Sequence, residues 1–328
     1  MPVMDAPPKA KLETAGTDRH ARFHDLVAKA RTHPPAKTAV THPCDQVSLE
    51  SVVEAARLRL IAPILVGPEA RIRSVAAEHQ LDIAPFEIVD ADYSQQAADK
   101  AVALVKEGRA EALMKGSLHT DELMGAVVKK ETGLRTSRRI SHCFVMDVPG
   151  HDQPLIITDA AVNIAPTLKE KVDIVQNAID LAHALGAPEV RVAILSAMET
   201  VNPDVTSTLE AAALCKMADR GQITGAVLDG PLALDNAISM EAASIKKISS
   251  PVAGRANVLV VPDLEAGNML AKSLSFLAGA DAAGIVLGAK VPIILTSRAD
   301  EETARIASCA VASLLVAARR ASASAAIQ

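Results

Sequence analysis

Aromatic residues are almost missing from this chain of 328 residues. Phe, Trp and Tyr together make up 2 %, with no Trp and a single Tyr93, while hydrophobic residues reach 49 %. Small aliphatic side chains must therefore fill the core, which suits helices that lie closely on a parallel sheet. The scarcity also argues against the aromatic stacking platforms that bind single-stranded nucleic acid.

Long basic runs and long apolar runs are also lacking. The net charge is −5, so we expect neither a nucleic acid nor an anionic membrane as a partner. The longest apolar runs, such as residues 306–318, are too short to span a bilayer. The first residues contain an acid and several prolines but no apolar segment, which excludes a signal peptide. Residues 1–18 are rich in Pro and Lys, and we expect them to be poorly ordered.

Cysteine is sparse and scattered. Cys44, Cys143, Cys215 and Cys309 form no Cys-x-x-Cys pair, which disfavours a disulfide scaffold and a metal site and favours a reducing, cytoplasmic location. His142 precedes Cys143, but neighbouring side chains of a strand point to opposite faces of the sheet. We therefore interpret Cys143 as a buried core residue and not as a nucleophile.

The first part of the chain alternates between helical and strand patterns. The strands are predicted at 63–67, 86–90 and 111–116, and the helices at 48–61, 69–80 and 94–108, the first capped by Ser48 and the last closed by Gly108. This alternation predicts an α/β fold whose parallel sheet is covered on both faces.

The middle of the chain changes character. Residues 140–163 read as two strands joined by a turn at Pro149–Asp152, which predicts a hairpin. Two capping boxes follow, Thr167–Glu170 and Ser207–Glu210. The helices that they begin are expected to end at Gly186 and Gly221. Further strands are predicted at 190–195, 223–228, 257–261, 282–288 and 291–295, and a last helix at about 300–320.

Polar residues follow the predicted strands, where open α/β sheets bind their ligands. A single polar residue at such a position more often caps a helix than binds a ligand. Polar residues at six strand ends together predict a ligand-binding site. The candidates are Lys115, Gly116, Ser117, His119, Thr120, Asp159, Asn163, Asp229, Gly230, Pro231, Glu265, Asn268, Ser297 and Arg298.

Two segments could bind an anion. Lys115 and the hydroxyl groups that follow it could hold phosphate, although the order of a Walker A motif is absent and an ordinary strand-to-helix turn is an equal reading. Arg135, Arg138 and Arg139 lie within five residues. They form either an anion clamp or a solvated basic loop.

Long runs of the sequence resemble the phosphate acetyl/butyryltransferase family. The resemblance extends from about residue 111 to 316. Its matching runs, in chain order, are LMKGSLHT, GLRTSRRISHCFV, ITDAAVNIAP, METVNP, DGPLALDNAIS, SPVAGRANVLVVPDLEAGNMLAKSL and AGIVLGAKVPIILTSRAD. The ending Thr-Ser-Arg-Ala-Asp favours the butyryl-type branch. The acetyl branch has an Asp seven residues after the Ser, where this chain has Ala304, and an Arg near Gly125 that is absent here.

The resemblance implies a homodimer of two three-layer αβα domains with mostly parallel sheets and a cleft between them, an architecture like that of isocitrate and isopropylmalate dehydrogenases. We assign residues 1–137 and 290–328 to the first domain. Residues 138–289 form the second domain, which we expect to form the dimer.

The implied reaction is acyl-CoA + phosphate ⇌ acyl phosphate + CoA for a short acyl group, acetyl or butyryl, without a metal, a permanently bound cofactor or a covalent intermediate. Ser297 would donate to the thioester or phosphate oxygen, and Arg298 would neutralise phosphate. Asp229 and Asp300 are the candidates for the base. The remaining candidates, with Arg135 and Arg138, would bind CoA and phosphate.

Two alternatives remain open. A metal-dependent hydroxyacid dehydrogenase would share the architecture but needs clustered aspartates, which are not obvious here. A non-catalytic CoA-binding domain would explain the missing Arg and the shifted acid. Acyl chain length is not determined, because one methylene is worth only about 1–3 kcal/mol in a pocket.

Overall fold

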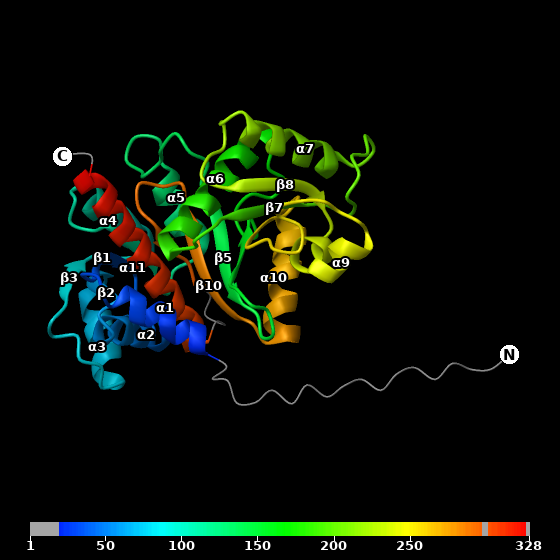
Figure 1. The fold of residues 1–328 in the computed structure, drawn as a ribbon. Coiled ribbons are helices and arrows are strands. Elements are labelled where there is room, and N and C mark those ends of the chain that lie inside the picture. Colours follow the sequence, from blue (N-terminus) through cyan, green and yellow to red (C-terminus); the bar gives the residue numbers. More distant parts are fainter. Residues whose placement is uncertain (1–19, 297–300, 326–328) are drawn as a thin grey trace.

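The structure, a computed structural model, describes residues 20–296 and 301–325. The predicted disorder of residues 1–18 lies outside this range. The chain forms a mixed α/β fold around one continuous sheet of 11 strands in the order β3-β2-β1-β4-β11-β10-β5-β6-β9-β7-β8 (Figure 1). Neighbouring strands are parallel except for the three pairs β11–β10, β10–β5 and β5–β6, so the sheet is mostly parallel.

The strands alternate with helices along most of the chain. The strands are β1 (Ala36–Thr41), β2 (Ile61–Gly67), β3 (Glu87–Asp90), β4 (Ala112–Lys115), β5 (Ser141–Asp147), β6 (Leu155–Thr158), β7 (Arg191–Leu195), β8 (Val227–Leu232), β9 (Val258–Val260), β10 (Asp281–Leu287) and β11 (Ile293–Ile294). The helices are α1 (Ala21–Ala30), α2 (Gln46–Arg57), α3 (Glu69–Glu78), α4 (Ser94–Lys106), α5 (Thr120–Val128), α6 (Leu168–Leu185), α7 (Thr206–Asp219), α8 (Leu234–Ile238), α9 (Met240–Ile245), α10 (Leu264–Ala278) and α11 (Glu302–Ala325).

Several predicted elements are confirmed with small shifts. Thr167 caps α6 through a capping box, and Gly186 ends the helix in the left-handed conformation with φ 85°. Strands β5 and β6 form the predicted hairpin, with Cys143 opposite Thr158. Gly108 follows the last residues of α4 with φ 74°, a conformation that favours glycine.

Two predicted helix starts are wrong. Asp45, not Ser48, caps α2, because the Asp45 carboxylate accepts a hydrogen bond from the Ser48 backbone N–H at 2.9 Å. The Ser207 capping box does not form. Ser207 Oγ instead lies 2.8 Å from Ser196 Oγ, and Glu210 pairs with Lys171 of α6. Tertiary partners have taken both side chains of the expected box.

Six elements were not predicted and one was misplaced. Strand β1 and the helices α1, α5, α8, α9 and α10 went unrecognised, and the strand expected at 223–228 lies at Val227–Leu232. The prolines and basic residues around β1 obscured a short strand that is buried in the middle of the first half of the sheet.

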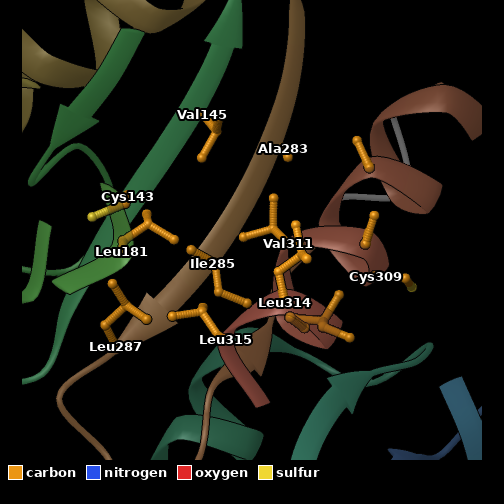
Figure 2. Packing of buried hydrophobic residues seen from close by; sticks show 14 of the residues in the cluster. Cys143, Val145, Leu181, Ala283, Ile285, Leu287, Cys309, Val311, Leu314 and Leu315 are labelled. Atoms are coloured by element: carbon orange, nitrogen blue, oxygen red, sulfur yellow. The ribbon is translucent and has the colours of Figure 1, made fainter. Parts of the chain in front are cut away.

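Helix α11 is the central element of the core. Its side chains Val311, Leu314 and Leu315 pack on Ile285 and Leu287 of β10, as Figure 2 shows. By length and composition α11 is the one helix of the described residues that could cross a membrane, but 61 % of its most apolar window is buried inside the protein. Helix α11 therefore packs in the core of this fold.

The hydrophobic core differs between the two faces of the sheet. On one face a single cluster runs across the whole molecule under α2, α11, α6 and α7. On the other face the core is divided into one cluster under α4 and α5 and another under α8 and α10. Helix α4 lies beside β1, β2 and β4, whereas α10 lies beside β6 in the other half of the sheet (Figure 1).

Strand direction brings two sets of carboxyl ends together. Strands β1 to β4 and β11 run one way, and β6 to β9 run the other way, with β10 and β5 between them. The pairing register places Met114, Ile294, Ile285, Cys143 and Thr158 in one row across the sheet. The carboxyl end of β4 and the carboxyl end of β6 therefore lie in the same row of the sheet, although the two strands run in opposite directions.

Candidate functional site

The first carboxyl edge lies at the ends of β1, β4 and β11. Lys115 is the last residue of β4 and is 8 % exposed. Its Nζ lies 3.4 Å from the Gly116 carbonyl and 3.4 Å from the Thr296 carbonyl. Ser297 directly follows Thr296 in the chain. Ser297, Arg298 and Asp300 themselves lie outside the described residues.

Gly116 allows β4 to approach β1 closely. A Cβ at this position would lie 2.5 Å from the Thr41 carbonyl oxygen, so no other residue fits there. The next residue, Ser117, donates its hydroxyl proton to the His42 carbonyl at 2.7 Å and accepts from the Cys44 N–H at 3.2 Å. Ser117 therefore anchors the turn at residues 42–44.

His42 joins this edge, although the sequence did not point to it. Its Nδ1 lies 3.1 Å from Ser117 Oγ. Because the only hydroxyl proton of Ser117 goes to the His42 carbonyl, Nδ1 must be the donor in this bond. Burial, followed by the positive charge of Arg71, holds the pKa of His42 below its usual value. The unpredicted strand β1 is the reason that His42 was missed, since it directly follows that strand.

His119 and Thr120 form the beginning of α5 and are exposed. The His119 backbone N–H donates to the Glu122 carboxylate at 2.9 Å, and the Ser94 hydroxyl bonds the other oxygen of Glu122. These bonds hold the pKa of Glu122 below its usual value. One backbone donor at this helix start is therefore already satisfied by the protein.

The second carboxyl edge is organised by Asp159, which follows β6. The Asp159 carboxylate is 3 % exposed and accepts bonds from the N–H groups of Ala161, Val162 and Asn163 at 2.9 to 3.2 Å. The Asn163 side chain also donates to the Ile140 carbonyl at 2.9 Å. Asp159 and Asn163 therefore form a buried brace that ties the 159–163 turn to the start of β5.

The three clustered arginines have different surroundings. Arg138 forms an ion pair with Asp180 at 2.7 Å, and Arg139 bonds Asn163 at 2.7 Å and Glu170 at 3.0 Å. Arg135 is exposed and forms no ion pair with any residue in the described ranges. Of the two arginines expected to bind an anion, Arg135 alone is without an acidic partner among these residues.

The remaining candidates lie along the second edge. Asn268 donates to the Ala160 carbonyl at 3.3 Å, and Glu265 is exposed in the first turn of α10. Both therefore stand beside the Asp159 turn.

Asp229, Gly230 and Pro231 belong to β8 at the far edge of the sheet, where the Asp229 carboxylate accepts from the Gly230 N–H at 2.9 Å. Six strands separate β8 from β4, or about 34 Å at roughly 4.8 Å per strand. The chain does not bring Asp229 to Lys115.

His142 and Gly284 lie where the two edges meet. A Cβ on Gly284 would stand 3.0 Å from the Leu295 carbonyl and 3.1 Å from His142 Nε2. His142 is 2 % exposed and packs edge-on against Phe144 with ring centroids 4.4 Å apart. Burial lowers the pKa of His142 to about 4, so the imidazole is neutral at physiological pH. Gly284 leaves room for the chain that leads to Ser297.

Cys143 faces the opposite side of the sheet, as predicted, and contributes to the continuous core cluster. Burial raises the pKa of its thiol to about 12, which removes it as a nucleophile. The four cysteines are free thiols. Within the described ranges, no three His, Cys, Asp or Glu side chains are placed to hold a metal ion.

A cavity of about 420 Å³ lies away from both carboxyl edges. It is bounded by α1, the end of α6 and the amino ends of β6 and β10. Lys115 and Thr296 instead line a small pocket of about 20 Å³ together with Asp45, Ser51 and Arg305.

Comparison with known proteins gives a consistent result. Residues 91–313 match the phosphate acetyl/butaryl transferase family. The chain is 66 % identical over 307 residues to a phosphate acetyltransferase of Rhizobium meliloti, covering 94 % of this chain and 97 % of that protein. It is 42 % identical over 295 residues to a phosphate butyryltransferase of Clostridium beijerinckii, with 90 % and 98 % covered.

Solved structures agree. A branched-chain phosphotransacylase from Enterococcus faecalis superposes with a TM-score of 0.75 at 31 % identity, covering 85 % of this chain and 99 % of that one. A 4-hydroxythreonine-4-phosphate dehydrogenase from Klebsiella pneumoniae has a TM-score of 0.52 at 15 % identity, with 86 % and 99 % covered, and shares the fold alone. On the matched family region and the extent of identity, the chain belongs to the phosphate acetyl/butaryl transferase family.

Proposed function

We propose that this phosphate acyltransferase, which exchanges an acyl group between CoA and phosphate, uses acetyl as its main acyl group. The identity over nearly the whole chain supports this choice, with 66 % to a phosphate acetyltransferase and 42 % to a phosphate butyryltransferase. The Thr296-Ser297-Arg298 ending favours the butyryl branch locally, but the whole chain carries more information about pocket shape than three residues.

The proposed reaction is a direct transfer in a ternary complex. A phosphate oxygen attacks the thioester carbonyl carbon, the carbon–sulfur bond breaks, and CoA leaves as the thiolate. In reverse, the thiol must give its proton to a base. Holding both substrates together supplies much of the rate. A donor aimed at the tetrahedral oxyanion is worth about 3–4 kcal/mol.

Lys115, Ser297 and Arg298 form the proposed reaction centre. The observation that carries this assignment is the approach of Lys115 Nζ to the Thr296 carbonyl at 3.4 Å, immediately before Ser297. Lys115 and Arg298 would neutralise the phosphate, and Ser297 would donate to the oxyanion. Arg135, exposed and without an acidic partner in the described ranges, would add positive charge for an incoming substrate.

The base is proposed to be Asp300 and not Asp229. Asp300 follows Arg298 by two residues in the chain, whereas Asp229 is separated from β4 by six strands. Replacing Asp300 by Asn should lower turnover about 100-fold or more, as expected for loss of a general base. The matched change Asp229→Asn should leave turnover within about threefold. The reverse ranking of the two variants would transfer the role to Asp229.

The activity test is phosphate-dependent release of thiol from acetyl-CoA and from butyryl-CoA. We expect release with both, and a kcat/KM for acetyl-CoA at least tenfold higher. A preference for butyryl-CoA would overturn the acetyl assignment. Silence with both substrates would favour the alternative of a non-catalytic CoA-binding domain.

Arg298→Gln tests the reaction centre. We expect turnover to fall at least 100-fold while the melting temperature stays unchanged. Arg220→Gln is the control, because Arg220 is an exposed arginine at the end of α7, which packs on the edge strand β8. Turnover of Arg298→Gln equal to that of the control would remove Arg298 from the site.

We also propose a two-domain organisation in which residues 1–137 with 290–328 face residues 138–289 across the divided core. The support is that this division falls between β11 and β10 in the strand order. The core of one face changes from the first cluster to the second nearby, within β10, because Val286 belongs to the first and Ala282 to the second. A cytoplasmic location and the absence of nucleic acid or membrane partners stay predictions from composition.

A homodimer through α10 is part of this proposal. Met269, Phe276 and Leu277 are 63 %, 83 % and 86 % exposed and recur on one side of α10. Nearby Ile245 at the end of α9 is 74 % exposed. So much exposed apolar surface is unusual for a monomer, and a second copy of this chain is the occupant that the family resemblance implies.

A further inference from the structure

Arg71 is an exposed cation beside the first carboxyl edge. It lies in the first turn of α3, which begins two residues after the end of β2. Arg71 has no ion pair or hydrogen bond with any residue of the ranges 20–296 and 301–325. Arg73, one turn position further, is instead paired with Glu69 at 2.7 Å. Arg71 thus keeps its guanidinium available for a ligand.

The start of α3 lies against the turn that Ser117 anchors. A Cβ on Gly67, the last residue of β2, would stand 3.3 Å from His42 Cα and 3.6 Å from Cys44 Sγ. The positive charge of Arg71 also helps to depress the pKa of His42, after the larger effect of burial. The end of β2 and the start of α3, whose first turn carries Arg71, therefore lie beside the turn at His42 and Cys44.

The strand that leads into the Arg71 helix lies at a distance from the proposed reaction centre. Strand β2 is two strands from β4 and three from β11, which corresponds to about 10 Å and 15 Å. The reacting phosphate must touch the thioester carbon, next to Lys115 and Thr296. An anion at Arg71 is a second one, held at a distance along the same edge.

Coenzyme A carries such remote anions. Its diphosphate and its 3′-phosphate lie at the end of the molecule away from the thiol, joined to it by a long flexible arm. A guanidinium binds phosphate through two parallel hydrogen bonds and keeps its charge at every relevant pH. The chemistry of Arg71 and the separation of β2 from β4 along the edge suit this end of the substrate.

We propose that Arg71 binds a phosphate group of the nucleotide end of acyl-CoA, with the pantetheine arm running along the carboxyl edge past His42 and Ser117 toward Lys115. This inference rests on the proposed function, because it takes acyl-CoA as the substrate. Arg71 is a binding residue here and has no role in the chemical step.

The test compares Arg71→Gln with Arg73→Gln, which removes an arginine from the same helix that is already paired. For Arg71→Gln we expect the KM for acetyl-CoA and the Kd for CoA, measured by calorimetry, to rise about tenfold. The KM for phosphate and kcat at saturating acetyl-CoA should stay within about twofold. Arg73→Gln should match the wild type in all four quantities.

Two further measurements sharpen the result. Affinity for CoA should fall less steeply with salt in Arg71→Gln, because one phosphate contact is lost. With 3′-dephospho-CoA, a vanished difference between wild type and Arg71→Gln assigns the 3′-phosphate, and a difference that stays about tenfold assigns the diphosphate.

An unchanged Kd for CoA in Arg71→Gln would overturn the inference and show Arg71 as a solvated surface residue. A rise in the KM for phosphate, or a fall in kcat, would also overturn it, because Arg71 would then act at the reaction centre. If wild-type protein binds CoA but releases no thiol, the proposed function fails while the calorimetric comparison still decides the role of Arg71.

Discussion

Gly284 shows how one missing side chain shapes the centre of the molecule. It is a buried residue of β10, and a Cβ on it would lie between the Leu295 carbonyl and His142 Nε2. A methyl group there would press on the Leu295 carbonyl, which lies two residues before Ser297 in the chain, and on His142. No sequence pattern singles out this glycine, because its neighbours come from strands that are distant in the chain.

Gly284→Ala should therefore harm activity more than stability. We expect a fall in kcat/KM of at least tenfold, with a loss of about 1–3 kcal/mol in the free energy of unfolding from overpacking. Gly125→Ala is the matched control, since a Cβ at this position of α5 meets nothing within 4 Å. The control should gain up to about 1 kcal/mol from helix propensity and keep its activity. Equal kinetics for the two variants would contradict the role given to Gly284.

His142 should make the fold sensitive to acid. Burial lowers its pKa to about 4, whereas the unfolded chain binds a proton at about pH 6.5. Between these two values the unfolded state holds more protons, so the free energy of unfolding falls as the pH falls, by up to about 1.4 kcal/mol per pH unit.

His142→Gln should remove this contribution. Urea unfolding at steps between pH 7 and pH 4.5 measures the slope of the free energy of unfolding against pH. We expect the slope of the variant to be clearly smaller than that of the wild type in this window. Identical slopes would mean that His142 is not held neutral by its burial.

At the scale of elements, α6 was predictable because its signals are local. Thr167 accepts a bond from the Glu170 N–H, the Thr167 N–H donates to the Glu170 carboxylate at 2.9 Å, and Gly186 ends the helix. Ser207 and Glu210 have the same spacing, yet their partners are Ser196 and Lys171 from other elements. The two sequence patterns are equal, but only the first forms a capping box. In the second, the Ser207 and Glu210 side chains bond residues of other elements in place of the helix N-terminus.

Thr167→Ala should cost about 1 kcal/mol, since it leaves a helix N–H without its cap. Thr167→Ser keeps the hydroxyl and should cost less than half as much. Chemical denaturation of both variants measures the difference. If the two substitutions are equally costly, the methyl group of Thr167 and not its hydroxyl stabilises α6.

At the scale of the whole molecule, we expect the exposed apolar side of α10 to be buried against a second copy of the chain. Phe276→Asp combined with Leu277→Asp places two charges in the proposed interface, which should convert a dimer into a monomer in light scattering at micromolar concentration. Both side chains are more than 80 % exposed, so the monomer should remain folded. Tyr93→Asp, an exposed change before α4, is the control and should leave the dimer intact. A monomeric wild type would contradict the proposed dimer.

The site could be predicted only in outline. Lys115, Asp159 and Asn268 do lie at carboxyl ends, because the general rule for parallel sheets depends on strand order within each βα unit. The separation of Asp229 from Lys115 was not predictable, since it depends on which strands become neighbours in a sheet of 11. The same limitation hid His42 and Arg71, which belong to the edge only because β1 and β2 pair beside β4.

The sequence by itself determined the α/β class, the family, the hairpin at β5–β6 and the caps of α6, since each depends on neighbours in the chain or on long matching runs. Tertiary structure alone decided that the two halves share one sheet and that their carboxyl ends meet in the row from Met114 to Thr158. The physical reason is that pairing register and strand direction are set by contacts among β4, β11, β10, β5 and β6, whose residues lie up to 182 positions apart.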